Sequence, residues 1–194
     1  MTKVKICGIT DKETLLKICQ LKVDYVGFVF AKSPRQITPE KAAVISEVVP
    51  KTIKKVGVFV SPTIAEVIQI ATTAKLDVIQ IHGKVPKGSL PLPVIIAQSP
   101  DKKDFNCCAD YLLLDAPAGK YAGGNGAIFD WKKIEIAKID KTNLFIAGGL
   151  NSQNVTAAIA YFSPFAVDVS SGVETGGKKD LAKITAFIQK VKTN

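Results

Sequence analysis

The sequence is poor in the residues that most often bind metals or cross-link chains. Its 194 residues contain a single histidine, His82, and four cysteines, none of which forms a Cys-x-x-Cys pair. A zinc site of spaced cysteine and histidine ligands is therefore not expected. No apolar run approaches the roughly 18 residues of a membrane span, and the start of the chain does not read as a signal peptide. These absences predict a cytoplasmic protein with reduced thiols and no membrane partner.

Acidic residues are also in the minority. The chain has 26 Lys and Arg against 17 Asp and Glu, which gives a formal net charge of +9. Such an excess permits binding to nucleic acid or to an anionic substrate. The lysines are scattered, however, with nothing denser than doublets such as Lys54-Lys55 and Lys178-Lys179. The sequence has no aromatic-basic RNA-binding pattern and no basic helix joined to heptads. We therefore expect a solvated basic surface and no nucleic-acid partner, with a nucleic-acid-binding face as the less favoured alternative.

Short β-branched runs alternate with amphipathic stretches along the whole chain, which predicts an α/β fold. The eight predicted strands are Lys3–Cys7, Tyr25–Phe30, Lys54–Val60, Val78–His82, Val94–Ala97, Tyr111–Asp115, Asn143–Ala147 and Phe165–Val169. Most of these runs are almost entirely apolar, as in strands buried on both faces of a parallel sheet. Eight such units without a linker favour one (β/α)8 TIM barrel over residues 1–194 rather than a doubly wound sheet.

Several residues predict where helices begin. Thr10 and Glu13 have the spacing of a capping box. Thr38 and Ser61 each precede a proline, and proline suits the first helical position. Asn151 and Asp130 are two further candidate caps.

The chain is very short for such a barrel, which typically has about 250 residues and about 200 at the lower end. Between the fourth and fifth predicted strands lie only residues 83–93, with three prolines and two glycines. Proline and glycine at that density argue against a helix. The next connection, residues 98–110, leaves room for one or two helical turns. The sequence thus predicts a compact barrel with its fourth helix reduced, and with the fifth as the next candidate for reduction.

Polar residues follow several of the predicted strands. Cys7 ends the first strand, Arg35 follows the second, His82 ends the fourth, Asp115 ends the sixth and Asp168 lies on the eighth. In barrels of this kind, chemistry collects at the carboxyl ends of the strands. We therefore expect these five side chains to meet at one face of the molecule.

Glycine and serine mark the loops in which such barrels often bind phosphate through backbone N–H groups, after strands seven and eight. The candidate phosphate-binding residues are Gly148, Gly149, Ser170, Ser171 and Gly172, with Gly124 and Gly126 in the loop after strand six. Glycine lets the backbone approach an anion closely. The alternative is that these glycines only form tight turns.

An ordered set of short motifs resembles the phosphoribosylanthranilate isomerase family. The blocks that carry the likeness are Lys5-Ile6-Cys7-Gly8-Ile9-Thr10, Val26-Gly27-Phe28-Val29-Phe30, Ser33-Pro34-Arg35, Gln80-Ile81-His82-Gly83, Leu114-Asp115, Gly123-Gly124-Asn125-Gly126, Phe129-Asp130-Trp131, Ala147-Gly148-Gly149-Leu150, Asp168-Val169-Ser170-Ser171-Gly172-Val173-Glu174 and Gly177-Lys178-Lys179-Asp180. They extend from residue 3 to about residue 180. The chain departs from the family at Asn125, where threonine is usual, and in the missing fourth helix.

The resemblance implies an enzyme of tryptophan biosynthesis that needs no cofactor or metal. Its reaction is an Amadori rearrangement of N-(5'-phosphoribosyl)anthranilate, an aminoaldose, to the aminoketose 1-(2-carboxyphenylamino)-1-deoxyribulose 5-phosphate. By resemblance, Cys7 is the general base and Asp115 the general acid. Arg35 resembles the clamp for the anthranilate carboxylate. Asp168 resembles a contact of the anthranilate amine or a residue that orients the substrate, and His82 a residue that lines the pocket.

These roles place opposite demands on the two reacting groups. A cysteine base needs its thiol pKa lowered from about 8.5, by a local charge or a helix N-terminus. An aspartic acid needs its pKa raised from about 3.9 to carry a proton near neutrality. The structural alternatives are a buried thiol at Cys7, a capping carboxylate at Asp115 or Asp168, a surface arginine at Arg35 and a histidine hydrogen-bonded to the backbone at His82.

Other functions stay open from sequence. A non-catalytic barrel that binds a phosphate ligand would use the same loops. A dual-substrate isomerase of the histidine and tryptophan pathways shares the fold, but it uses an aspartate at the position of Cys7. The family includes monomers and dimers, so the chain is expected to be a monomer or a homodimer whose partner is a small phosphorylated substrate.

Overall fold

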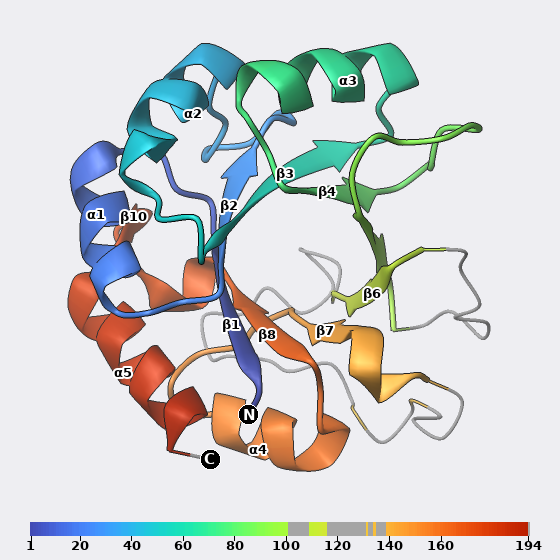
Figure 1. The fold of residues 1–194 in the computed structure, drawn as a ribbon. Helices are drawn as coiled ribbons and strands as arrows, with labels where there is room; N and C mark the ends of the chain where they lie inside the picture. The colour runs from blue at the N-terminus through green and yellow to red at the C-terminus, as the bar shows by residue number, and fades with distance from the viewer. Residues whose placement is uncertain (101–108, 116–130, 132–133, 135–138, 194) are drawn as a thin grey trace.

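Eight parallel strands close into a barrel in the computed structural model, which describes residues 1–100, 109–115, 131, 134 and 139–193 (Figure 1). The strands are β1 (Lys3–Cys7), β2 (Tyr25–Val29), β3 (Lys54–Val60), β4 (Val78–His82), β5 (Val94–Gln98), β6 (Tyr111–Leu114), β7 (Leu144–Ile146) and β8 (Ala166–Val169). Each pairs with the next along the chain, and β8 pairs with β1 to close the ring. The predicted barrel is thereby confirmed, with strand ends that differ from the predicted ones by no more than one residue.

Helices lie on the outside of this barrel (Figure 1). They are α1 (Lys12–Gln20), α2 (Pro39–Ile45), α3 (Ile64–Thr73), α4 (Val155–Phe162) and α5 (Leu181–Lys192), with the 3₁₀ turns η1 (Ser46–Val48), η4 (Lys141–Asn143) and η5 (Ser171–Val173). Residues 83–93, between β4 and β5, form turns and irregular backbone instead of a helix. The predicted loss of the fourth helix is confirmed. Most of the connection from β5 to β6 falls outside the described residues, as does Asp130.

Helix α1 begins one residue later than its predicted cap. Asp11, and not Thr10, is the N-cap, and its carboxylate accepts a hydrogen bond of 2.8 Å from the backbone N–H of Thr14. Glu13 does not reach back to form a capping box, because it pairs with Lys17 one turn ahead at 2.6 Å. An aspartate caps as well as a threonine, and the pair four residues apart adds its own stabilisation.

The prediction that Ser61 caps α3 is also wrong. The N-cap is Thr63, which forms a full capping box with Glu66. Ser61 has a positive φ of 48°, and its hydroxyl accepts a hydrogen bond from the backbone N–H of Lys84. The helix can therefore start only after the chain has turned. Thr38 does cap α2 as predicted, with its hydroxyl 3.2 Å from the backbone nitrogen of Lys41.

Asn151, another predicted cap, lies about one turn before the start of α4. Asn154 is the N-cap of this helix. Asn151 instead accepts a hydrogen bond from the N–H of Gln153, and its own N–H donates to the side chain of Asn154. The two asparagines together shape the turn that follows β7.

The barrel interior is divided along its axis. Alternate residues of each strand point inward, and near the amino ends of the strands these are apolar. This interior cluster consists of Tyr25, Val56, Val78, Ile95, Leu113, Phe145, Ala147 and Ala166. Nearer the carboxyl end, the inward positions of β4 and β8 are Gln80 and Asp168, and those of β1 are Lys5 and Cys7. A polar layer therefore lies at the carboxyl end of the barrel, above an apolar base.

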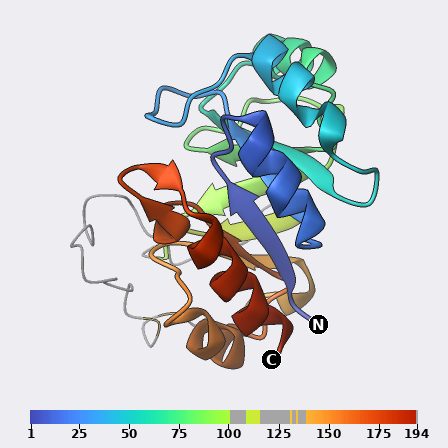
Figure 2. The same ribbon diagram turned by 90° about the vertical axis from the view of Figure 1, so that its left-hand side faces the viewer.

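A small hairpin lies beside this polar layer. Strands β9 (Glu174–Thr175) and β10 (Lys178–Lys179) pair antiparallel across Gly176 and Gly177, whose φ angles are 58° and 75°. A two-residue turn with positive φ at both positions strongly favours glycine. In Figure 2 the hairpin lies at the end of the barrel away from the two chain termini.

Candidate active site

A lysine that sequence reasoning missed lies at the centre of the polar layer. Lys5 is fully buried, and its Nζ donates to Oδ2 of Asp168 at 2.8 Å. The two residues are register partners on β1 and β8, so the strand pairing itself brings them together. Burial lowers the pKa of Lys5, but the charge of Asp168 and contact with Cys7 outweigh it and leave the pKa above its ordinary value. The signal was a lysine two residues before Cys7, on the same face of an otherwise apolar strand.

Cys7 ends β1 and is 7% exposed. Its register partner is Gly27 on β2, where a Cβ would lie 2.7 Å from the Cys7 sulfur. Glycine at that position therefore makes room for the thiol. Burial raises the pKa of the Cys7 thiol above its ordinary value, while the nearby Lys5 ammonium opposes this rise. The lowering expected from the sequence is thus not found, although a neighbouring charge of the expected sign is present.

Asp115 directly follows β6 and alternates with Leu113, which places it on the inward face. Burial raises the pKa of its carboxyl to about 7, with a further rise from the charge of Asp168 and a partial offset from Lys5. The direction is the one that a general acid requires. The group therefore holds its proton over a much wider pH range than an exposed aspartate.

His82 ends β4 and lies beside Gln80 on the same face. The amide Nε2 of Gln80 is 2.8 Å from the ring Nε2 of His82. Burial lowers the pKa of His82, and the Lys5 charge adds to the effect, so the ring is neutral near pH 7. The role predicted for His82, that of lining the pocket, stays a prediction.

Arg35 has a partner that the sequence did not reveal. Its Nε and Nη2 donate to the two carboxylate oxygens of Glu174, at 2.7 and 2.6 Å. The stem of Arg35 crosses Gly8, where a Cβ would lie 2.5 Å from its Cδ. This places the guanidinium at the end of β1, close to Cys7. The arginine is thus held in place, with one edge of its guanidinium engaged by Glu174.

Lys179 joins Arg35 and Glu174 in one hydrogen-bonded network. Its Nζ donates to Glu174 at 2.7 Å and to the backbone oxygen of Ser170 at 2.9 Å. Ser170 in turn donates from its hydroxyl to the backbone oxygen of Cys7. The side chains of Glu174 and Lys179 are only 6% and 5% exposed. Burial raises the pKa of Glu174, but its hydrogen bonds to Arg35 and Lys179 prevail and hold it below its ordinary value. The network therefore fixes the loop after β8 to the end of β1.

The predicted phosphate loops after β7 and β8 lie against each other. Gly148 and Gly149 have φ angles of 79° and 69°, a conformation that other residues rarely adopt. A Cβ on Gly172 would collide with the backbone oxygen of Leu150, so glycine permits the contact between the loops. Ser171 begins the turn η5. The other two predicted residues, Gly124 and Gly126, lie outside the described residues.

The polar layer keeps some hydrogen-bonding capacity unused. Oδ1 of Asp168 and Oε1 of Gln80 are buried and have no hydrogen-bond partner in the described part of the chain. Such atoms are rare in folded proteins, because each carries a desolvation cost. Acceptors left unpaired inside a barrel mouth fit a site that binds a polar ligand.

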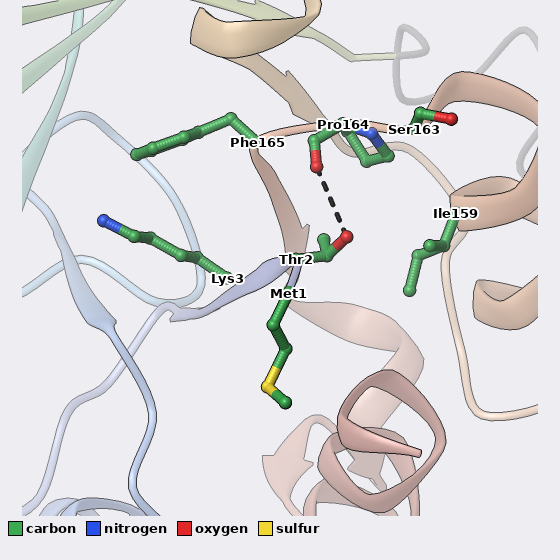
Figure 3. Close-up of a pocket in the computed structure, with 7 residues that line it drawn as sticks. All are labelled: Met1, Thr2, Lys3, Ile159, Ser163, Pro164 and Phe165. Carbon is green, nitrogen blue, oxygen red and sulfur yellow. Dashed lines mark hydrogen bonds between the residues drawn. The ribbon is translucent and has the colours of Figure 1, made fainter. Parts of the chain in front are cut away.

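Among the described residues, no group of three His, Cys, Asp or Glu side chains is arranged to hold a metal ion. Within the same residues, no helix is long and apolar enough to cross a membrane. A cavity of about 420 Å³ lies at the opposite end of the barrel, lined by Lys3, Ile159 and Phe165 among others (Figure 3). None of the predicted site residues lines it.

Residues 4–190 match the profile of the N-(5'-phosphoribosyl)anthranilate (PRA) isomerase family. The chain belongs to this family. A PRA isomerase of Streptococcus mutans is 46% identical over 99% of this chain and 100% of its own length. The crystal structure of the PRA isomerase of Thermotoga maritima is 36% identical, covers both chains fully and superposes with a TM-score of 0.84. Another PRA isomerase structure, 35% identical with a TM-score of 0.82 and full coverage of both chains, is a complex with reduced 1-(o-carboxyphenylamino)-1-deoxyribulose 5-phosphate.

Membership of the PRA isomerase family makes this chain an enzyme, an isomerase of tryptophan biosynthesis. The alternatives of a non-catalytic phosphate-binding barrel and a nucleic-acid-binding protein are therefore set aside. The fold expected from the resemblance is confirmed by the closed barrel and by the structures it resembles.

Proposed function

We propose that this chain converts N-(5'-phosphoribosyl)anthranilate to the corresponding aminoketose, with Cys7 as general base and Asp115 as general acid. The observation that carries the assignment is the inward position of both groups at one end of the barrel, with the pKa of Asp115 at about 7. Cys7 ends β1 and Asp115 follows β6, and these two strands are separated by β8 and β7 around the ring. Such a separation suits two groups that act on opposite sides of one sugar.

In the proposed first step, protonated Asp115 gives its proton to the furanose ring oxygen. The bond between this oxygen and C1 breaks, and the amine nitrogen forms a double bond to C1 in an open-chain iminium. The Cys7 thiolate then takes the proton from C2, and the electron pair of that bond neutralises the iminium as an enolamine. Loss of the proton on the C2 oxygen and gain of one at C1 give the aminoketose. These reaction steps need one acid and one base, both held in place near the substrate.

The two groups share one proton in the reactive form, in which Asp115 is protonated and Cys7 is a thiolate. The pKa of Asp115 is about 7 and that of Cys7 is above its ordinary value. Of the two arrangements with one proton, the one with a Cys7 thiol and an Asp115 carboxylate is therefore the more populated. We infer that the positive charge developing on the substrate amine stabilises the thiolate during the reaction.

The rest of the substrate is proposed to be held by three elements. Arg35 uses two of its five N–H groups on Glu174, so the far edge of the guanidinium can bind the anthranilate carboxylate bidentately. Oδ1 of Asp168 can accept the anthranilate N–H, since Oδ2 is taken by Lys5. The backbone around Gly148, Gly149 and Ser170 to Gly172 is proposed to bind the phosphate, with Gly124 and Gly126 as further candidates from the loop after β6. His82 is proposed to line the pocket.

The test is an assay of the purified protein that follows loss of the fluorescent anthranilate substrate. We expect Cys7→Ala and Asp115→Ala each to lower kcat by about 10²- to 10⁴-fold, the usual contribution of a general acid or base. Cys19→Ala, which removes a half-buried cysteine on α1, is the matched control and should keep full activity. Unchanged turnover in both Cys7→Ala and Asp115→Ala would overturn the mechanism.

The oligomeric state and location stay predictions. Light scattering of the purified chain would distinguish a monomer from a homodimer. The cytoplasmic location would be checked by fractionation of the cells that produce it.

A further inference from the structure

Lys5 is placed where an aliphatic residue would be expected. The interior of a barrel is normally filled by apolar side chains, and a buried ammonium is costly unless it is paired. Lys5 is fully buried and pairs with Asp168 at 2.8 Å. A buried ion pair of this kind adds little stability compared with well-packed apolar residues. Stability therefore does not explain why this ion pair lies beside Cys7, whereas a role in the chemistry of the site would.

The geometry of β1 links this lysine to the thiol. Lys5 and Cys7 are two residues apart, so they point to the same face and their Cα atoms are about 7 Å apart. The extended lysine side chain spans that distance. Its ammonium donates to the carboxylate of Asp168. Burial raises the pKa of the Cys7 thiol, and the charge of Lys5 opposes that rise.

Other charged groups also face Cys7, but they are committed elsewhere. Lys179 donates to Glu174 and to Ser170, and Arg35 donates to Glu174. The carboxylate of Asp168 disfavours a thiolate, because it carries the same sign of charge. Lys5 lies on the same strand and the same face as the thiol, and its charge opposes the rise in the pKa of Cys7 more strongly than that of Lys179 does.

We propose that Lys5 is a positioning residue of the isomerase, whose ammonium group stabilises the thiolate of Cys7 while Asp168 keeps that ammonium protonated inside the barrel. The inference rests on the proposed function, in which Cys7 is the base. It gives Asp168 a second task besides contact with the substrate amine. It also explains why the strand carries a charge two residues from its reactive end.

The direct test measures thiolate formation in the absence of substrate. The ultraviolet absorbance of the thiolate is followed against pH, and the signal of a Cys7→Ser variant is subtracted to isolate Cys7. In Lys5→Met the thiolate faces Asp168 without its counter-charge, so we expect the midpoint to rise by about one pH unit or more. Lys5→Gln can still bond Asp168 without a charge and should give the same direction, which keeps the test valid if Lys5→Met does not fold.

Lys3→Met is the matched control. Lys3 lies on the same strand and the same alternating face as Lys5, but its Nζ lies over the ring of Phe165 at the other end of the barrel. The thiolate midpoint should not move in this variant. An unchanged midpoint in folded Lys5→Met or Lys5→Gln, or an equal rise in Lys3→Met, would overturn the proposal.

The second readout is the pH profile of kcat/KM. Loss of Lys5 should lower the plateau by about tenfold, because one pH unit in the thiol midpoint changes the reactive population tenfold. The basic limb should move to higher pH together with that midpoint. A merely structural loss would lower the whole profile without moving this limb, and that result would contradict the proposal. Since the absorbance titration uses no substrate, it is independent of Cys7→Ala turnover, which tests the proposed function itself.

Discussion

The two ends of the barrel interior use the same strands for different purposes. At the amino end, the rings of Tyr25, Tyr111, Phe145 and Phe165 contact one another with centroids 5.3–5.6 Å apart. At the carboxyl end, Lys5 and Asp168 are paired, but Oδ1 of Asp168 and Oε1 of Gln80 are left without partners in the described part of the chain. The first end is packed as a hydrophobic core is packed. The second end keeps an arrangement that costs stability and suits a polar ligand.

The contrast can be seen within one strand. Lys3 and Lys5 occupy equivalent alternating positions on β1, yet Lys3 lies over an aromatic ring and Lys5 lies inside a charged cluster. Two residues along a strand, about 7 Å, separate the part of the molecule that stabilises the fold from the part that is proposed to perform the reaction. Substitutions at the two ends should therefore affect different properties.

The largest effect is expected from Phe145→Ala at the amino end. Phe145 is fully buried and contacts three other rings, so its removal should lower the free energy of unfolding by about 3–5 kcal/mol. Urea denaturation would measure the loss. At a temperature where the variant is still folded, kcat should be close to that of the parent. Val60→Ala, at an exposed position on β3, should change stability by less than about 0.5 kcal/mol. A large fall in kcat of folded Phe145→Ala would break the separation between the two ends.

The next largest effect is expected from Asp115→Asn, which should raise the free energy of unfolding, whereas Phe145→Ala lowers it. The folded-state pKa of Asp115 is about 7, and in the unfolded chain the value is about 3.9. Between these values the folded protein binds more protons than the unfolded one, so the contribution of Asp115 to stability falls as the pH rises from 4 to 7. We therefore expect Asp115→Asn to gain about 2 kcal/mol in free energy of unfolding at pH 8 and nothing at pH 4, while activity is lost.

Urea titrations of both proteins at the two pH values would measure this difference. A gain that is equal at pH 4 and pH 8 would show that the gain comes from packing rather than from the buried carboxyl.

The smallest of the three effects is expected from Glu174→Gln at the rim of the carboxyl end. Glutamine keeps one acceptor but removes the charge that holds Arg35 and Lys179. If Arg35 binds the anthranilate carboxylate, KM should rise by about tenfold, with a much smaller change in kcat. A rise of this size corresponds to the loss of about one charge-assisted hydrogen bond. Glu66→Gln alters an exposed helix cap and should leave KM unchanged. A fall in kcat without a rise in KM would assign Glu174 to the chemistry instead.

Much of the fold could be predicted from the sequence because its signals are local. The apolar runs of β1, β3 and β4 were predicted with their ends as observed, and the prolines of residues 83–93 correctly excluded a helix. Competition between neighbouring groups explains the errors. Thr10 lost its capping role to Asp11, and Ser61 lost its role to a turn with positive φ that delays α3 to Thr63.

The candidate site was predicted only in part, because its contacts join distant residues. Cys7, Asp115 and Asp168 were found by their positions at strand ends. The pairing of Arg35 with Glu174 joins residues 139 positions apart, and no local sequence pattern predicts it. Lys5 was counted as part of an apolar strand, although its alternation with Cys7 was visible. The raised pKa of Cys7 also depends on burial by the whole barrel, which sequence alone does not quantify.

The segment that replaces the fourth helix has a consequence for the entropy of folding. Val85, Leu90 and Leu92 pack against the core from this segment, so it covers the strands as a helix would, without a helix's hydrogen bonds. Pro86, Pro91 and Pro93 restrict the unfolded chain in the same region, because each fixes its own φ. The chain therefore loses fewer conformations when this cover is ordered. Replacing these prolines with alanine would leave the loop's contacts in place and lower stability mainly by enlarging the unfolded ensemble.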